Sequence, residues 1–299
     1  MTPRPDAAGT DTTDIALYDR TARHAAAVVI SAYSTSFGLA SRLLGPRVRP
    51  HVRNVYALVR VADEIVDGSA SQAGVSAAAQ RRILDALETE TLTAVEEGFS
   101  ANLIVHAFAR TARECGIGEN LVRPFFASMR TDLDVAAHDA SSHDSYVYGS
   151  AEVVGLMCLQ TFVNAGGSHP RPADADLVDG ARRLGAAFQD VNFLRDLPHD
   201  VGSLGRDYLG VGGDAPDAPT RGDVLDRIDA DLDAAGAIIP RLPADCRRAV
   251  TAAHDLFTAL SRRLRRAGGT TQRVRVPNAV KLGLAARATV GAAPLRAGS

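Results

Sequence analysis

Two aspartates one helical turn apart, Asp63 and Asp67, have the chemistry to bind a divalent cation. They lie in the stretch YALVRVADEIVD at residues 56–67, where apolar residues recur every three to four positions without Gly or Pro, a pattern that predicts a helix. On a helix, residues four apart share a face at roughly 6 Å, and two carboxylates there repel by about 0.2–0.5 kcal/mol. A shared Mg²⁺, which prefers oxygen ligands, would relieve that repulsion. Taken alone, the pattern is more typical of a solvated acidic surface.

The same predicted face carries a guanidinium and a phenol. Arg60 precedes Asp63 by one turn, and Tyr56 precedes Arg60 by another. Gly68 then ends the helix. The face therefore presents Tyr, Arg, Asp and Asp in order.

A second acidic face occurs in FQDVNFLRDLPHD at residues 188–200. Four polar residues follow helical spacing there: Gln189, Asn192, Asp196 and Asp200. Arg195 stands directly before Asp196, and Pro198 should kink the helix or mark its last turn, so the direction of the Asp200 side chain is less well defined. One such face would be unremarkable, because Asn and Asp often cap helices. Two similar faces are harder to dismiss.

Antiparallel packing of the two helices in a bundle would let both acidic faces line one cavity. Such a cavity would hold about four carboxylates, and buried unpaired charges are so costly that a cation cluster is their natural partner. Divalent ions bridged by the two walls would hold a diphosphate. This arrangement suits the ionisation of an allylic diphosphate, with an apolar, aromatic pocket sheltering the carbocation.

The rest of the chain predicts one all-α domain. Helical periodicity recurs in ten segments: 17–44 (broken near residue 36), 48–67, 78–97, 101–115, 119–137, 144–165, 173–200, 221–238, 243–267 and 277–290. Residues 68–77 and 201–220 are predicted as loops. No stretch alternates apolar and polar residues as a half-buried strand would, so a sheet is not expected. No repeat of 20–50 residues is found. We expect a disordered lead-in at 1–14, one domain at 15–290 and a tail at 291–299.

Composition excludes several classes of function. The chain has 299 residues and a net charge of −2, which argues against nucleic acid as a partner. Its three isolated cysteines and scattered histidines predict neither a disulfide framework nor a zinc site. The longest apolar run, 153–163, is too short to span a bilayer. The predicted location is cytoplasmic, with a peripheral contact at the inner face of the membrane left open.

The two acidic motifs together resemble the squalene/phytoene synthase family of head-to-head prenyltransferases. Four further segments agree in order: STSF at 34–37, YVYGSAEVVG at 146–155, Tyr208, and RVRV at 273–276 followed by Lys281. The resemblance spans about residues 30–285. Within it, the sequences YVYGSAEVVGLM and ADEIVDG are most like those of bacterial phytoene synthases. It implies a helical bundle of the isoprenoid synthase type with a central cavity.

The resemblance implies a role for each matching residue. Two or three Mg²⁺ ions, with Mn²⁺ as an alternative, would be held by Asp63, Asp67, Asn192, Asp196 and Asp200. Diphosphate would be contacted by Arg60, Arg195, Arg273, Ser34 and Ser36. The rest of the substrate site would be lined by Phe37, Tyr56, Tyr146, Tyr208, Gln189, Ala186 and Ala187, with the tyrosines near the diphosphates or the cyclopropyl intermediate.

Three departures from the family pattern accompany these matches. Glu64 stands where many members have Asp, but it lies one residue off the metal face, so we expect little effect. Pro198 and His199 replace a more usual Gly-Glu pair, which bears on the geometry of Asp200. Phe257 stands where the resemblance implies a Tyr, so that hydroxyl is absent here.

The resemblance predicts a phytoene synthase of carotenoid biosynthesis. Two geranylgeranyl diphosphates would condense through a cyclopropyl diphosphate, with loss of diphosphate and no redox cofactor. The alternative is a squalene or dehydrosqualene synthase that uses two farnesyl diphosphates. A chain-elongating synthase or terpene cyclase would share the acidic helices but not the STSF and RVRV segments. A non-catalytic helical scaffold should have lost charged residues from one motif, whereas both are complete here.

Overall fold

The protein is entirely helical wherever the structure describes it. The computed structural model describes residues 13–34, 36–134, 140–199, 208–211, 219–268 and 274–297, and these ranges contain helices and connecting turns but no strand. The predicted all-α class is therefore confirmed. The first twelve residues of the predicted lead-in and most of the predicted 201–220 loop lie outside these ranges.

The long helices follow the predicted segments closely. Their bounds are α1 (Asp14–Tyr33), α2 (Ser36–Arg42), α3 (Arg49–Val66), α5 (Ala77–Glu97), α6 (Leu103–Cys115), α7 (Glu119–Asp134), α10 (Ala175–His199), α11 (Arg221–Ile238), α12 (Ala244–Ala267) and α13 (Asn278–Thr289). A 3-10 turn, η3 (Ile239–Arg241), joins α11 to α12. The predicted 68–77 loop contains a single helical turn, α4 (Ser69–Gln72). It was missed because four residues are too few to show periodicity.

Capping residues explain several of these boundaries. The Asn102 side chain accepts hydrogen bonds from the backbone N–H groups of Ile104 and Val105, which starts α6. Thr220 and Asp223 form a reciprocal capping box at the start of α11. Gly98 ends α5 in the left-handed region, at φ 88°, which glycine adopts without steric cost.

The segment predicted as one buried helix over 144–165 is divided into three parts. They are α8 (Ala140–Val147), a π-helical turn η1 (Tyr148–Glu152) and α9 (Val153–Asn164). Close packing accounts for the glycines here: a Cβ on Gly155 would lie 2.6 Å from the Ala181 carbonyl oxygen, and one on Gly185 would lie 2.6 Å from that of Ala151. Periodicity could not reveal the π turn, because the segment is apolar almost all round, so the shift of phase that an extra residue causes leaves no visible change in the pattern.

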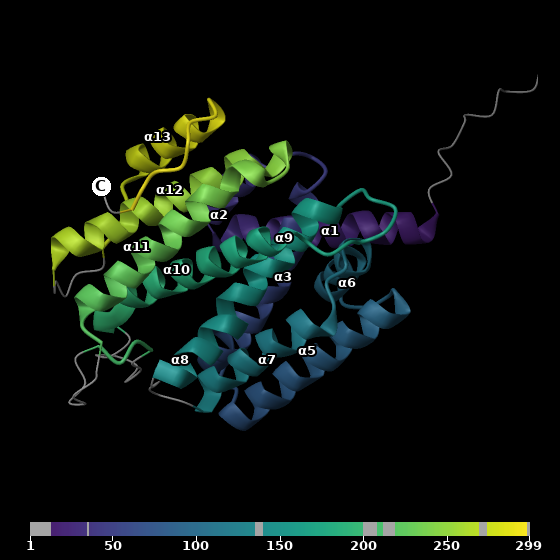
Figure 1. Ribbon diagram of the computed structural model, residues 1–299. Helices are drawn as coiled ribbons and strands as arrows, with labels where there is room; N and C mark the ends of the chain where they lie inside the picture. The colour runs from purple at the N-terminus through teal and green to yellow at the C-terminus, as the bar shows by residue number, and fades with distance from the viewer. Residues whose placement is uncertain are drawn as a thin grey trace, which may run out of the picture.

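Three apolar clusters form the core of the described residues, and α3 and α10 each contribute one face to it; the smallest joins α1, α3 and α6. The first cluster joins α3, α5, α6, α7 and α9, with Leu58, Phe108 and Phe126 almost fully buried. The second joins α8, α10, α11 and α12 and includes Val191 and Ile228. Figure 1 shows α10, α11 and α12 side by side, with α13 outside α12 and with α5 and α7 on the opposite side of the molecule. Within the described residues, no helix is long and apolar enough to cross a membrane.

Candidate active site

The polar face of α3 is formed as the sequence predicts. Its opposite side buries Val55, Leu58, Ala62 and Val66 in the core, which turns the residues between them away from that core. The helix ends at Val66, and the backbone N–H of the capping residue Asp67 donates to the Asp63 carbonyl at 2.8 Å. The two aspartates are therefore one turn apart, at the end of the helix.

Arg60 is held by three partners on and beside this face. Its guanidinium forms an ion pair with Glu64, lies 3.9 Å from the Asp63 carboxylate and stacks 4.6 Å above the Tyr33 ring. Ser69 donates a second hydrogen bond to Glu64. Glu64 therefore holds Arg60 in place, an interaction that the sequence analysis did not assign to it.

Asp63 is the most perturbed carboxyl group of this face. About a third of its side chain is exposed (32%), yet burial and the neighbouring carboxylates Asp67 and Asp132 together raise its pKa to about 7, against the opposing effect of Arg60. The side chain is therefore reached by water and still strongly desolvated. Two carboxylates one turn apart, Asp63 and Asp67, with Arg60 as a nearby opposing charge, are oxygen donors of the kind that a divalent cation takes.

Asp132, on α7, is a site residue that the sequence analysis missed. It is 4% exposed. Its Oδ1 accepts a hydrogen bond from the Tyr146 hydroxyl at 2.7 Å and a longer one from the Tyr208 hydroxyl at 3.4 Å. A sequence signal did exist: Asp132 continues the apolar stripe of α7 that contains Phe125 and Met129. A carboxylate in such a stripe is unusual unless it has a partner.

Two of the three tyrosines predicted at the site, Tyr146 and Tyr208, are brought together around Asp132. Tyr146 and Tyr208 have ring centroids 5.5 Å apart, and Phe193 of α10 stacks on Tyr208 at 4.5 Å with an interplanar angle of 7°. Asp67 is among the charges that raise the pKa of Tyr146, after burial and Asp132. The tyrosines and the acidic end of α3 therefore belong to one cluster.

A second, aromatic cluster lies toward the N-terminal half of α3. Phe37 of α2 contacts Tyr56 and Phe188 at centroid distances of 6.5 and 6.1 Å. Phe188 in turn stacks on Phe257 of α12 at 3.8 Å. Ser34 is close by, since its hydroxyl accepts a hydrogen bond from the backbone N–H of Phe37 at 3.0 Å. The predicted residues Ser34, Phe37 and Tyr56 are thus neighbours; the side chain of Ser36 lies outside the described set.

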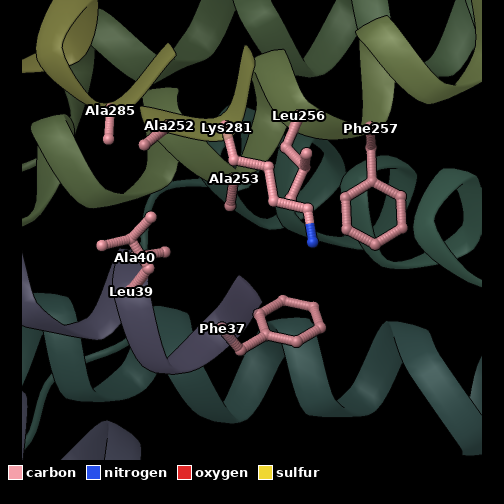
Figure 2. A pocket seen from close by; sticks show the side chains of 9 residues that line it. All are labelled: Phe37, Leu39, Ala40, Ala252, Ala253, Leu256, Phe257, Lys281 and Ala285. Atoms are coloured by element: carbon pink, nitrogen blue, oxygen red, sulfur yellow. The ribbon is translucent and has the colours of Figure 1, made fainter. Parts of the chain in front are cut away.

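Figure 2 shows a pocket beside this aromatic cluster, between α2 and the α12–α13 pair. Phe37 and Phe257 face each other across it, and the Lys281 ammonium points between their rings. The remaining lining residues are aliphatic, among them Leu39, Ala252 and Leu256. The pocket therefore has an apolar wall with one cation. The sequence analysis noted Lys281 in the C-terminal basic segment but gave it no role in the site.

The order of contacts shows that α3 and α10 run in the same direction, so the antiparallel arrangement considered from the sequence is wrong. Tyr56 and Phe188 meet through Phe37, whereas Asp67 and Phe193, each later in its helix, meet through Tyr146. Periodicity defines a helix face but not the direction of a helix, which depends on the connections between the two. The aromatic residues Tyr56 and Phe188 therefore lie earlier in the two helices, and the acidic residues Asp67 and Asp196 lie later.

The polar residues of α10 are only partly described. Gln189, Asn192 and Asp196 are half-buried, and Arg195 pairs with Asp196 at 3.0 Å. The helix ends at His199, so Pro198 lies in its last turn, as one of the two predicted alternatives has it. Asp200 and Arg273 lie outside the described residues, and their assigned roles stay predictions.

Ala186 and Ala187 were predicted to line the substrate site. Ala187 is fully buried in the core. Ala186 lines a separate cavity of about 440 Å³, with Arg182 and Asp190 among its polar neighbours, rather than the aromatic cluster. Among the residues with described side chains, no three acidic, histidine or cysteine side chains converge as metal ligands. Because the second motif is incomplete there, the four-aspartate metal site stays a prediction.

Comparison with known proteins decides the family. The model of the squalene/phytoene synthase family matches residues 30–211, well over half of the chain. The chain belongs to the squalene/phytoene synthase family. It is therefore a prenyltransferase of the head-to-head class, the coarse assignment predicted from the two acidic motifs.

Relatives and solved structures agree with this family. The chain is 27% identical to a 15-cis-phytoene synthase of Paracoccus sp. over 274 residues, covering 84% of this chain and 85% of that protein. It is 28% identical to a phytoene synthase of Rhodobacter capsulatus, covering 87% and 78%. A dehydrosqualene synthase crystal structure superposes with a TM-score of 0.75 at 23% identity, covering 92% of this chain and 97% of that one. A squalene synthase of Alicyclobacillus acidocaldarius gives 0.70 at 20% identity, covering 84% and 95%. The last two show that this family member has their fold.

Proposed function

We propose that this member of the family is a phytoene synthase that condenses two geranylgeranyl diphosphates head to head, in carotenoid biosynthesis. The observation that carries the proposal is the similarity to phytoene synthases of Paracoccus and Rhodobacter over more than four fifths of the chain. The alternative, condensation of two farnesyl diphosphates, rests on the likeness to dehydrosqualene and squalene synthases, which is a likeness of fold.

The residues of the acidic cluster would hold the metal ions. We propose Asp63 and Asp67 from α3, with Asn192, Asp196 and Asp200 from the second motif, as ligands of two or three Mg²⁺ ions. When bound, Mg²⁺ would neutralise the charge that develops on the departing diphosphate. The crowding that raises the pKa of Asp63 supports this assignment, because a cation would remove the repulsion.

The remaining polar residues would bind and orient the substrates. Arg60, which Glu64 holds in place, would contact a diphosphate together with Arg195 and Arg273. Ser34 and Ser36 would bind the diphosphate of the second prenyl group, beside Phe37. The proximity of Ser34, Phe37 and Tyr56 supports a common substrate site.

The aromatic residues would exclude water and stabilise positive charge. Ring faces carry partial negative charge and attract cations. The stacked pair Phe188 and Phe257, with Phe37 and Tyr56, would shelter the prenyl chains, with Gln189 on the same helix as Phe188. The first condensation forms a cyclopropyl diphosphate, and its rearrangement ends with loss of a proton, so that no redox cofactor is needed.

Product analysis tests this proposal. Purified enzyme is incubated with Mg²⁺ and either geranylgeranyl or farnesyl diphosphate, each with and without NADPH. The hydrocarbons are then extracted and identified by their molecular masses in a mass spectrometer. We expect a C40 hydrocarbon from geranylgeranyl diphosphate without NADPH. Exclusive turnover of farnesyl diphosphate to a C30 product would overturn the proposal in favour of the alternative.

We also propose a peripheral membrane contact through α13. Val280 (36%) and Leu282 (61%) are exposed on α13, and Val290 (82%) is exposed directly after it. From residue 256 to the C-terminus the sequence has nine Lys and Arg residues and no Asp or Glu. Exposed apolar side chains in a stretch of sequence that is rich in Lys and Arg suit the surface of an anionic bilayer. A long hydrocarbon product would also partition into that bilayer.

A further inference from the structure

Asp132 lies in an environment that a carboxylate tolerates only when it has strong partners. It is 4% exposed on the apolar side of α7, between α3 and the tyrosine cluster. Burying a carboxylate costs several kcal/mol unless hydrogen bonds or opposite charges compensate it. Two phenols are among its hydrogen-bond donors. The carboxylate therefore anchors side chains inside the fold and is not a surface charge.

Both phenols donate to the same carboxylate oxygen. Tyr146 comes from α8 and Tyr208 from a short segment far along the chain, and their hydroxyls lie 2.7 and 3.4 Å from Asp132 Oδ1. The shared acceptor fixes the ends of two rings that no helix connects. Phe193 then stacks on Tyr208 from α10, which completes a wall of three rings.

Helix α7 holds Tyr146 at two points. Ser128, one turn before Asp132, donates from its hydroxyl to the Tyr146 backbone carbonyl at 3.1 Å, while Asp132 accepts from the side-chain hydroxyl. Gly149 allows this approach, because a Cβ there would collide with Ser128. With both its backbone and its hydroxyl anchored, Tyr146 cannot rotate away without breaking a contact to α7.

We propose that Asp132 is a positioning residue, whose carboxylate fixes Tyr146 and Tyr208 as a rigid aromatic wall beside Asp63 and Asp67. The inference rests on the proposed function only in that the wall faces a carbocation during the reaction. Preorganised rings stabilise a cation without reorganising at the moment of reaction, which lowers the barrier of the chemical step. Loss of the anchor should therefore lower kcat more than it alters KM.

Tyrosine spectroscopy provides a readout that does not depend on activity. The chain has six Tyr and no Trp, so its near-ultraviolet absorption and fluorescence arise chiefly from tyrosine. A phenol that donates to a carboxylate absorbs at longer wavelength and fluoresces weakly. In Asp132→Asn we expect a blue-shifted difference spectrum and brighter fluorescence. Both changes should be smaller in a Tyr146→Phe background, because the stronger donor is already absent there.

Kinetics complete the test through a double-mutant cycle. We expect Asp132→Asn to lower kcat about 10–100-fold, the range found for residues that orient a site, with KM changed less than threefold. The loss should be smaller when Tyr146→Phe is already present, because the two residues act as one unit. Asp134→Asn, which alters an exposed carboxylate on the same helix, is the matched control and should change neither spectrum nor kcat.

Several outcomes would overturn the proposal. An unchanged tyrosine spectrum in Asp132→Asn would show that the hydrogen bonds do not form. An equal loss of kcat with and without Tyr146→Phe would show that Asp132 acts independently of that tyrosine. If Asp132→Asn fails to fold by circular dichroism, Tyr146→Phe and Tyr208→Phe against wild type give the same spectral test. The kinetics use whichever prenyl diphosphate is turned over, so a wrong substrate assignment leaves this test intact.

Discussion

The carboxylate of Asp132 on α7 lies close enough to Asp63 on α3 to raise the pKa of Asp63, although the two residues are far apart in the sequence. Two helices thus bring like charges together at the acidic end of the site. Such a contact lowers stability in the absence of a cation and favours binding when one is present. The first two predictions follow from this relationship.

Removing the charge of Asp63 should stabilise the metal-free protein at neutral and higher pH. Its pKa rises from 3.8 to about 7 on folding, so the folded protein retains a proton that the unfolded chain loses. This group therefore lowers stability progressively as pH rises from about 4 to about 7. Asp63→Asn should gain on the order of 1–2 kcal/mol at pH 8, a figure discounted for water that reaches the side chain. Denaturant unfolding with EDTA at pH 5 and pH 8 measures it, and the gain should shrink at pH 5.

Asp134→Asn provides the reference for this experiment, since its side chain is 58% exposed. It should show no comparable dependence on pH. A stability gain for Asp63→Asn that is equal at pH 5 and pH 8 would contradict the electrostatic explanation.

Metal dependence should disappear when either acidic motif is broken. Mg²⁺ should raise the melting temperature of the wild type at pH 8 and support turnover, because it binds only the folded site. In Asp63→Ala and in Asp196→Ala, turnover should fall by at least about 100-fold while helicity is retained. Differential scanning fluorimetry with and without EDTA, alongside product assays, makes the comparison. Full activity in both variants would rule out a mechanism that uses the two motifs.

The stacked rings Phe188 and Phe257 should contribute to stability as a pair. Each change to Ala should cost about 3–5 kcal/mol. The double variant should lose about 0.5–1.5 kcal/mol less than the sum of the two, because the stacking term is lost only once. Urea unfolding of the four proteins gives the coupling energy. Strict additivity would mean that the 3.8 Å contact contributes no energy of its own.

Membrane binding should depend on the exposed apolar residues of α13. The wild type should float with vesicles of anionic lipid and much less with neutral vesicles, because screened electrostatic attraction supplements apolar burial. Leu282→Glu should reduce binding several-fold. Ile83→Glu is the matched control, since Ile83 is an exposed apolar residue on α5, on the other side of the molecule. Equal loss in both variants would argue against a contact specific to α13.

The sequence by itself determined the helices and the face of α3. Apolar side chains at helical spacing must be buried on one side, so Tyr56, Arg60 and Asp63 had to share the other. Helix ends followed from capping residues and glycines, which act within one turn. The two acidic motifs and the four further segments together indicated the family, because residue types and their spacing are local properties of the chain.

Only the tertiary structure decided which residues meet across helices. Periodicity carries no information on helix direction, so the parallel course of α3 and α10 could not be derived from it. Asp132 and Glu64 each depend on partners that the sequence did not indicate: Tyr146 and Tyr208 for the first, Arg60 and Ser69 for the second. A site assembled from separate helices is defined by their packing, whereas each of its walls is defined by the local sequence.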